Sequence, residues 1–120
     1  MKAVLLVSHG SRSPETKKEV RQLLGRLKRK LSWPIIQYAF LEIEKPSIPQ
    51  GIERCVRQGA KDILVLLNFL NSGKHVDQDI PRLVNEARCR FPGVRLRISM
   101  PIGQHPKIDD LFLDLIHKKF

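Results

Sequence analysis

Cysteine is scarce in this sequence, which has only Cys55 and Cys89 among its 120 residues. The two are isolated and match none of the short spacings typical of metal-binding or redox-active cysteine pairs. Both fall in segments that we expect to be helical, where a lone thiol usually serves as a small buried or half-buried side chain. We therefore assign neither cysteine a chemical role.

Long hydrophobic runs are also missing. No apolar segment approaches the ~20 residues that a membrane-spanning helix needs, and the five apolar residues after Lys2 are too few for the hydrophobic part of a signal peptide. We expect a cytoplasmic protein with no membrane partner. Hydrophobic residues still make up 42% of the chain, which is typical of a globular protein and not of a disordered one.

Acidic residues are few relative to basic ones, since 12 Asp and Glu stand against 22 Lys and Arg and give a formal net charge of +10. This excess favours an anionic partner such as nucleic acid, a membrane surface or a polyacid ligand, although a solvated basic surface would also explain it. Aromatic residues make up only 6% and are not interleaved with the basic ones. Because no platform for stacking bases is visible, the sequence argues against a nucleic acid partner.

Apolar runs alternate with amphipathic helical segments along the whole chain. Continuous runs of Val, Ile and Leu are typical of strands buried on both faces of a parallel sheet. The expected strands are 3–7, 35–41, 62 to 67 or 69, and 94–100, and the expected helices are 14–31, 47–58, 76–91 and from 107 to about 118. This order predicts one α/β domain over residues 1–120, a three-layer αβα sandwich with a four-stranded parallel sheet, flavodoxin-like winding and helices on both faces.

Local signals support several boundaries. Ser47 is a typical helix start, Gly59 is a typical helix end, and Ser32-Trp33-Pro34 breaks the first helix. Apolar and polar residues alternate in the last strand, which predicts a half-exposed strand at the sheet edge. We expect the last helix to bury one apolar face, made by Ile108, Leu111, Phe112, Leu115 and Ile116. Leu113 would point away from that face, toward solvent or another subunit.

Three of the four histidines follow the ends of expected strands. His9 follows the first strand, His75 lies in the loop after the third and His105 follows the fourth, while Glu42 ends the second. Because ligands bind at the carboxyl ends of parallel strands, we expect His9, Glu42 and His75 to lie together. Two imidazoles and a carboxylate can bind a divalent metal or accept protons near neutral pH, and the residues alone leave both roles open.

Short motifs spread over nearly the whole chain add a family resemblance. In order, they are Ser8-His9-Gly10-Ser11-Arg12 with Pro14; Ala39-Phe40-Leu41-Glu42 with Pro46-Ser47 and Gly51-Ile52; Gly59-Ala60; Phe69-Leu70 with Gly73 and His75; Asp79-Ile80-Pro81; and Pro101-Ile102-Gly103-Gln104-His105-Pro106. In this ordered combination the chain resembles the small, single-domain sirohydrochlorin cobaltochelatases, which belong to the class II tetrapyrrole chelatases. It departs from them at Asn68, where many members have proline, and it lacks the histidine-rich segment of some archaeal members.

The resemblance implies a chelatase-like fold and an enzyme that inserts a divalent metal into sirohydrochlorin, a polycarboxylate tetrapyrrole of cobalamin or siroheme biosynthesis. It makes His9 and His75 the catalytic residues and metal ligands, and it makes Glu42 the acid that joins them around the metal. The metal is a substrate, with Co²⁺ expected first and Fe²⁺ or Ni²⁺ left open, and no organic cofactor is expected. Since 120 residues hardly cover both faces of a macrocycle, the short form is expected to pair as a homodimer.

Residues within or beside these motifs are candidate substrate contacts: Ser8, Gly10, Arg12, Phe69, Leu70, Ser72, Gly73 and Lys74. Among them, Arg12 and Lys74 carry the charge that suits a substrate with many carboxylates. His105 belongs to a family motif but has no assigned chemical step there. We therefore expect it to support the site or the fold.

Two other functions compete with a chelatase. A histidine-dependent phosphatase would also place a histidine after its first strand, but those enzymes carry an arginine immediately before it, where this chain has Ser8. A non-catalytic basic module would bind RNA or another acidic partner without needing the histidines, and its affinity would fall with salt.

Overall fold

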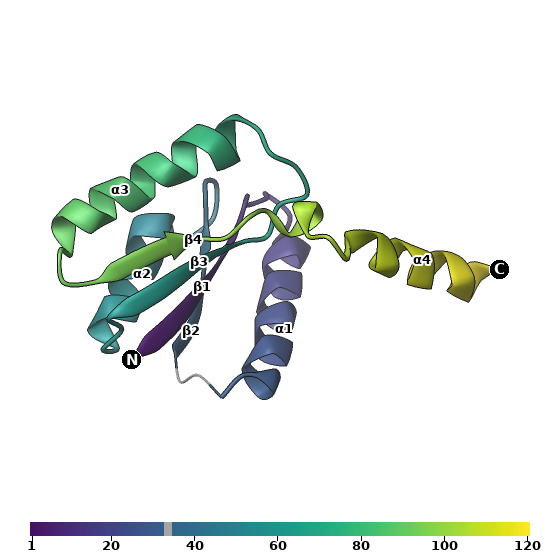
Figure 1. Cartoon of the computed structure of the whole chain (residues 1–120), viewed down its shortest axis with the longest axis horizontal. Helices are drawn as coiled ribbons and strands as arrows, with labels where there is room; N and C mark the ends of the chain where they lie inside the picture. The colour runs from purple at the N-terminus through teal and green to yellow at the C-terminus, as the bar shows by residue number, and fades with distance from the viewer. Residues whose placement is uncertain (33–34) are drawn as a thin grey trace.

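The computed structural model describes residues 1–32 and 35–120. Strands and helices alternate as expected (Figure 1), and they are β1 (Lys2–Ser8), α1 (Pro14–Lys30), β2 (Ile35–Phe40), α2 (Ile48–Arg57), β3 (Asp62–Leu67), α3 (Ile80–Arg90), β4 (Arg95–Ile98) and α4 (Ile108–Lys119). A π-helical turn at His75–Asp79 precedes α3, and a 3-10 turn at Ile102–Gln104 precedes α4. α1 ends within a residue of the expected position, while the Trp33-Pro34 part of the expected break lies outside the described residues.

The four strands form one parallel sheet in the order β2-β1-β3-β4. β1 therefore lies in the interior, and its residues 3–8 are all buried, which accounts for its unbroken apolar run. β4 lies at an edge, as the alternating pattern predicted. Because all strands run in the same direction, their carboxyl ends meet at one edge of the sheet.

Helices cover both faces of this sheet, which confirms the αβα layering (Figure 1). α2 and α3 pack on one face over a core that includes Leu5, Ile52 and Val84. α1 packs on the other face, where Leu24 meets Leu6 in a smaller core. Each such side chain contributes about 1.5–3 kcal/mol when it leaves water, so the sheet and its three covering helices form the stable body of the molecule.

α2 begins where Ser47 predicts and lies very close to the sheet. The Ser47 side chain accepts a hydrogen bond from the Gln50 backbone N–H (3.3 Å), and the Gln50 side chain accepts one from the Ser47 N–H (2.9 Å). This capping box satisfies the first free donors of the helix. A Cβ at Gly51 would lie 2.8 Å from Leu5 Cδ1 and 2.9 Å from Ala39 Cβ, so the lack of a side chain permits the close approach.

The two cysteines occupy different environments. Cys55 lies on α2 and is completely buried, and this burial raises the pKa of its thiol to about 11. The thiol therefore stays neutral at physiological pH and acts as a packing side chain, as expected. Cys89 lies on α3 and is exposed, so the expectation of a buried or half-buried thiol is wrong for this residue.

α4 departs from the expected layering, because it projects from the body as an arm, the yellow helix of Figure 1. The side chains expected to be buried are exposed or, for Ile108, half-buried, and Leu111 and Leu115 reach 60% and 62% exposure. The expectation of a buried face is therefore wrong for the single chain. Tertiary contacts set this direction, since the Gly103 N–H donates to the Phe69 carbonyl (3.0 Å) just before the helix begins. Within the described ranges, every helix is too short or too polar to cross a membrane.

Candidate metal centre

The pairing of β1 with β2 continues past both strands and aligns the loops that carry His9 and Glu42. The Leu41 N–H donates to the Ser8 carbonyl (2.9 Å), and the Glu42 N–H donates to the His9 carbonyl (3.1 Å). Gly10 then turns the chain with a φ of +105°, and any side chain there would collide with the Glu42 carbonyl. The two loops are thus held together as one backbone unit.

Three side chains converge at this edge of the sheet. Nε2 of His9 lies 2.7 Å from Oε1 of Glu42, and Nε2 of His75 lies 3.9 Å from the same oxygen. The two imidazole rings have centroids 5.2 Å apart. One donor atom from each residue lies within 4.8 Å of the other two, and each side chain is about half exposed. The expected meeting of the three residues is confirmed, and the spacing suits one divalent cation held by two imidazoles and a carboxylate.

Both imidazoles turn Nε2 toward this shared point because an acceptor binds the other ring nitrogen. A carbonyl can only accept, so the 3.0 Å contact with the Gly10 oxygen makes Nδ1 of His9 the N–H donor. Nδ1 of His75 donates in the same way to a carboxylate oxygen of Asp79 at 2.7 Å. Each Nε2 of the neutral rings then carries a lone pair, available to a metal ion or to a proton.

Asp79 is a site residue that the sequence reasoning missed. In the sequence it stands out only as an acid suited to a helix start and as part of a short motif. In the structure, the π-helical turn replaces the first turn of the regular helix expected from 76 onward and brings His75 and Asp79 together. The available signal was the spacing, since an acid four residues after a histidine can reach its ring on one face of a helix.

The candidate substrate contacts lie at different depths. Ser8 is buried, and its Oγ accepts a hydrogen bond from the Asn68 side chain (3.0 Å), which ties β1 to the end of β3. Gly10 and Phe69 are half-buried, and the exposed candidates are Arg12, Leu70, Ser72, Gly73 and Lys74. His105 lies outside the cluster of three, and its Nδ1 accepts a hydrogen bond from the Lys107 N–H (3.0 Å). This contact fits the supporting role expected for His105.

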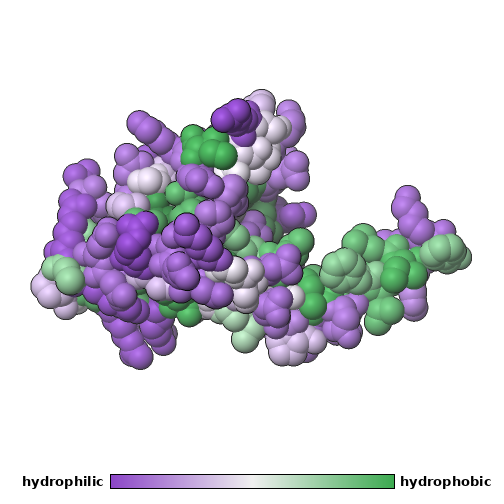
Figure 2. Space-filling view, turned by 90° about the horizontal axis from the view of Figure 1, so that it is seen from above, coloured by the Kyte–Doolittle hydropathy of each residue, from purple (hydrophilic) through white to green (hydrophobic). Residues whose placement is uncertain are grey.

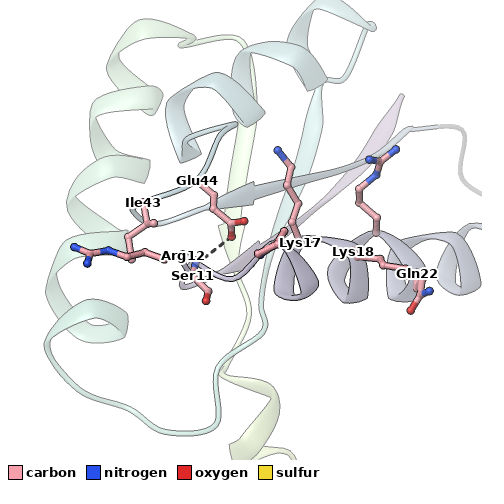
Figure 3. Close-up of a pocket in the computed structure, with 9 residues that line it drawn as sticks. Ser11, Arg12, Lys17, Lys18, Gln22, Ile43 and Glu44 are labelled. Carbon is pink, nitrogen blue, oxygen red and sulfur yellow. Dashed lines mark hydrogen bonds between the residues drawn. The ribbon is translucent and has the colours of Figure 1, made fainter.

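A pocket of about 790 Å³ opens beside the cluster, between the start of α1 and the loop after β2 (Figure 3). Its wall begins at Ser11, two residues after His9, and includes Glu44, two residues after Glu42. Two residues of chain span at most ~7 Å, so the pocket adjoins the cluster. The Ser11 N–H donates to a Glu44 carboxylate oxygen (3.1 Å), which links the two sides of the pocket.

The pocket is strongly basic, and four of its lining residues are Arg12, Lys17, Lys18 and Arg21. Lys17 donates to the Lys45 carbonyl (2.8 Å). Within the described part of the chain, the other three form no ion pair, so their charges are available to a ligand. Sequence reasoning singled out only Arg12, because the other three belong to a basic helix face that solvent exposure already explains.

Comparison with known proteins identifies the family of this chain. The sequence model of the CbiX family matches residues 3–119. The chain belongs to the CbiX family. The chain is 34% identical to the chloroplastic sirohydrochlorin ferrochelatase of Arabidopsis thaliana over 97% of its own length and 50% of that protein. It is 36% identical to the sirohydrochlorin cobaltochelatase of Methanococcus maripaludis over 95% of its own length and 96% of that protein.

A solved structure confirms the fold of this CbiX-family chain. The sirohydrochlorin chelatase SirB from Bacillus subtilis subspecies spizizenii, in complex with cobalt, superposes with a TM-score of 0.88 at 32% identity. The match covers 98% of this chain and 50% of that one. The chain therefore spans about half the length of the Arabidopsis and Bacillus relatives and nearly the whole of the Methanococcus one.

Proposed function

We propose that this CbiX-family chain is a chelatase that inserts a divalent metal into sirohydrochlorin. The convergence of His9, Glu42 and His75 carries this proposal, because both Nε2 atoms face one carboxylate oxygen. The relatives support it, since two are named for sirohydrochlorin chelation and the solved structure holds cobalt.

The chemistry of metallation suits the two imidazoles. One M²⁺ replaces two pyrrole N–H protons, and no electron is gained or lost. His9 and His75 bind the cation in their neutral form, and each Nε2 that the cation leaves can accept one of the two protons. Asp79 then stabilises the imidazolium of His75, because its carboxylate accepts the Nδ1–H at 2.7 Å. Glu42 holds the cation electrostatically until the ring nitrogens replace it.

The basic pocket supplies a binding site for the carboxylates of the substrate. Sirohydrochlorin carries carboxylates around its rim, and a macrocycle centred over His9 would extend part of this rim toward Arg12, Lys18 and Arg21. A guanidinium binds a carboxylate through two parallel hydrogen bonds, and the lysine adds a mobile positive charge. Binding would thus be strongest for the most heavily carboxylated macrocycles.

Co²⁺ is the metal that we propose first, with Fe²⁺ and Ni²⁺ as further substrates. Two nitrogen ligands and one oxygen ligand accept all three ions, so the supply of metal in the cell contributes to the choice. The relatives are named for iron in one case and for cobalt in the other. The reaction requires no organic cofactor.

We also propose that residues 1–120 act as one domain and that two copies pair as a homodimer. Two copies equal the length of a relative of which this chain covers 50%. The cytoplasmic location stays a prediction, since the Arabidopsis relative is chloroplastic.

The decisive experiment follows the visible spectrum of sirohydrochlorin mixed anaerobically with Co²⁺ and the purified protein. We expect wild type to metallate well above the spontaneous rate and the His9→Ala/His75→Ala variant to match the no-enzyme control. His117→Ala is the matched control, because this histidine is exposed on α4, and it should retain full activity. Repeating the measurement with Fe²⁺ and Ni²⁺ ranks the metals. If wild type does not exceed the spontaneous rate with any of the three, the chelatase assignment is wrong and a basic binding module becomes the better explanation.

A further inference from the structure

Ile43 is an exposed apolar residue on the body of the molecule, directly after Glu42 of the candidate metal centre. Its side chain is 59% exposed, and it belongs to neither hydrophobic core. Figure 2 shows that hydrophobic side chains gather along the projecting α4 arm, whereas hydrophilic ones dominate the visible face of the body. An isoleucine left this exposed on the body gains little from the folding of the chain.

The backbone at Ile43 adopts a conformation that disfavours isoleucine. Its φ is +72°, and the Glu44 N–H donates to the Glu42 carbonyl (2.8 Å), which closes a γ-turn. A γ-turn with positive φ is rare and strained, and a β-branched side chain there is an outlier. Within residues 1–32 and 35–120, every other positive φ belongs to a glycine. The chain thus carries an apolar side chain where glycine would be relaxed, and strain of this kind is concentrated at functional sites.

Two hydrogen bonds to the loop after β1 hold this turn in place. The Glu42 N–H donates to the His9 carbonyl (3.1 Å) before the turn, and the Glu44 carboxylate accepts from the Ser11 N–H (3.1 Å) after it. Both bonds are made by the neighbours of Ile43, so they fix the direction of its side chain without packing of its own. A side chain held in this way loses less conformational freedom when a ligand contacts it.

Ile43 also lines the basic pocket beside the metal centre. Its Cα lies about 3.8 Å from that of Glu42, the usual spacing of consecutive residues. Figure 3 shows Ile43 and Arg12 at one end of the pocket and Lys18 at the other. A ligand that extends from the metal donors into this pocket therefore meets an apolar side chain before it reaches Lys18.

We propose that Ile43 contacts the flat apolar face of the tetrapyrrole ring and that the strained γ-turn holds it there. The metal enters the centre of the ring, so a side chain one residue from a metal donor faces the ring itself, whereas Arg12, Lys18 and Arg21 face the carboxylates of its rim. Contact between the two apolar surfaces releases water from both. This inference rests on the proposed function. It adds a residue that selects a flat macrocycle over other polycarboxylates, which the cations alone would also bind.

Titration of metal-free sirohydrochlorin into the protein, followed by its visible spectrum with no metal added, tests the contact. We expect Ile43→Gly and Ile43→Asn to bind about 5- to 20-fold more weakly than wild type, because both remove the apolar surface and both tolerate a positive φ. Ile43→Val keeps most of that surface and should stay within about fourfold of wild type. Leu113→Ala is the matched control, because Leu113 is 48% exposed on the projecting arm, and it should bind as wild type does.

Ionic strength separates the apolar contact from the charged ones. The fold-loss in Ile43→Gly should be the same at low and at high salt, because no charge is removed. The fold-loss in Arg21→Ala should shrink at high salt, because ions screen an exposed charge. A loss in Ile43→Gly that disappears at high salt would overturn the apolar contact.

Heat stability and Co²⁺ affinity separate the contact from a purely structural role. Ile43→Gly should melt at or above the temperature of wild type, because glycine relieves the strain of the turn. Its Co²⁺ affinity, measured by isothermal titration, should be unchanged, because the backbone bond between Glu42 and His9 remains. Weaker Co²⁺ binding in both Ile43→Gly and Ile43→Asn would make Ile43 a support of the metal centre and would overturn the contact with the ring.

Failure of this contact and failure of the chelatase proposal give different results. Wild-type affinity for the ring in both Ile43→Gly and Ile43→Asn would overturn the contact and leave metallation by wild type untouched. A wild type that binds the ring without metallating it would overturn the chelatase, and loss of binding in the two variants would still establish the contact. A wild type that does not bind the ring would overturn both.

Discussion

α1 and α4 are both amphipathic helices of one chain, yet only one has its apolar face covered. On α1, Val20 and Leu24 are 5% and 6% exposed beneath the sheet. On α4, Leu111 and Leu115 are 60% and 62% exposed at the same helical spacing. The comparison shows that apolar periodicity predicts a helix and its apolar face. It does not predict which surface packs against that face. A covered stripe contributes to the folding of the chain, whereas an exposed one contributes little to it.

The largest expected difference between the two helices is in folding stability. Leu24→Ala should lower the free energy of unfolding by about 2–5 kcal/mol, because it leaves a cavity in a packed core. Leu111→Ala on α4 should change it by less than ~0.5 kcal/mol, because Leu111 is 60% exposed in the single chain. Urea denaturation of dilute protein measures both, and equal losses would mean that α4 packs within its own chain.

A second comparison concerns two carboxylates that each contact a basic side chain on their own helical turn, one at the candidate site and one on α4. Asp79 and Asp114 each lie four residues from a basic partner, His75 and Lys118, at 2.7 and 3.0 Å. Asp79→Ala should weaken Co²⁺ binding about 10–100-fold, since it releases the ring that presents Nε2 to the metal. Asp114→Ala should leave Co²⁺ affinity unchanged. Isothermal titration measures both affinities, and an unaltered affinity in Asp79→Ala would contradict the role given to this carboxylate.

A smaller effect is expected from Leu115→Ala. If α4 packs only between chains, the variant should melt roughly 2–8 °C below wild type in concentrated, dimeric samples and at the same temperature in dilute ones. Scanning calorimetry over a range of concentrations measures the difference. A melting temperature lowered equally at every concentration would place the Leu115 contact inside the single chain.

The smallest expected effect concerns the two cysteines, because one lies on a buried helix face and the other on an exposed one. Cys55 should resist alkylation at pH 8, because it is buried and its pKa is raised to about 11. Cys89 should react, since it is exposed on α3. Mass spectrometry of native protein treated with iodoacetamide should find one adduct, at Cys89, and modification of Cys55 would contradict its burial.

Much of the site could be predicted because a parallel sheet sorts the chain by direction. His9, Glu42 and His75 each follow a strand, and parallel strands deliver their ends to one edge whatever the details of the loops. The parallel direction of the strands brings the three residues to one edge, and the loops after the strands then set the distances between them. The same reasoning found the edge position of β4 and the buried interior position of β1.

The remaining features depend on contacts that the sequence does not display. Asp79 lies four residues after His75, but this spacing indicates a contact only if His75 belongs to the helical turn, and the expected helix began one residue later and left His75 in the loop. Lys18 and Arg21 become pocket residues only because the loop after β2 lies opposite α1. The direction of α4 depends on Gly103 seating against the backbone of Leu70, a contact between residues far apart in the chain.

The backbone pairing of the two loops also ranks the three donors by how firmly they are held. His9 and Glu42 sit on strand extensions joined by two hydrogen bonds, so neither backbone shifts without the other. His75 sits on a separate segment that follows Gly73, and its Nε2 is 3.9 Å from the shared oxygen instead of 2.7 Å. The position of His75 is therefore set by its own π-helical turn and by Asp79, independently of the paired loops that carry His9 and Glu42. If these three residues hold a cation, we expect His75 to be the first ligand to leave it, because neither hydrogen bond of the paired loops fixes the His75 backbone.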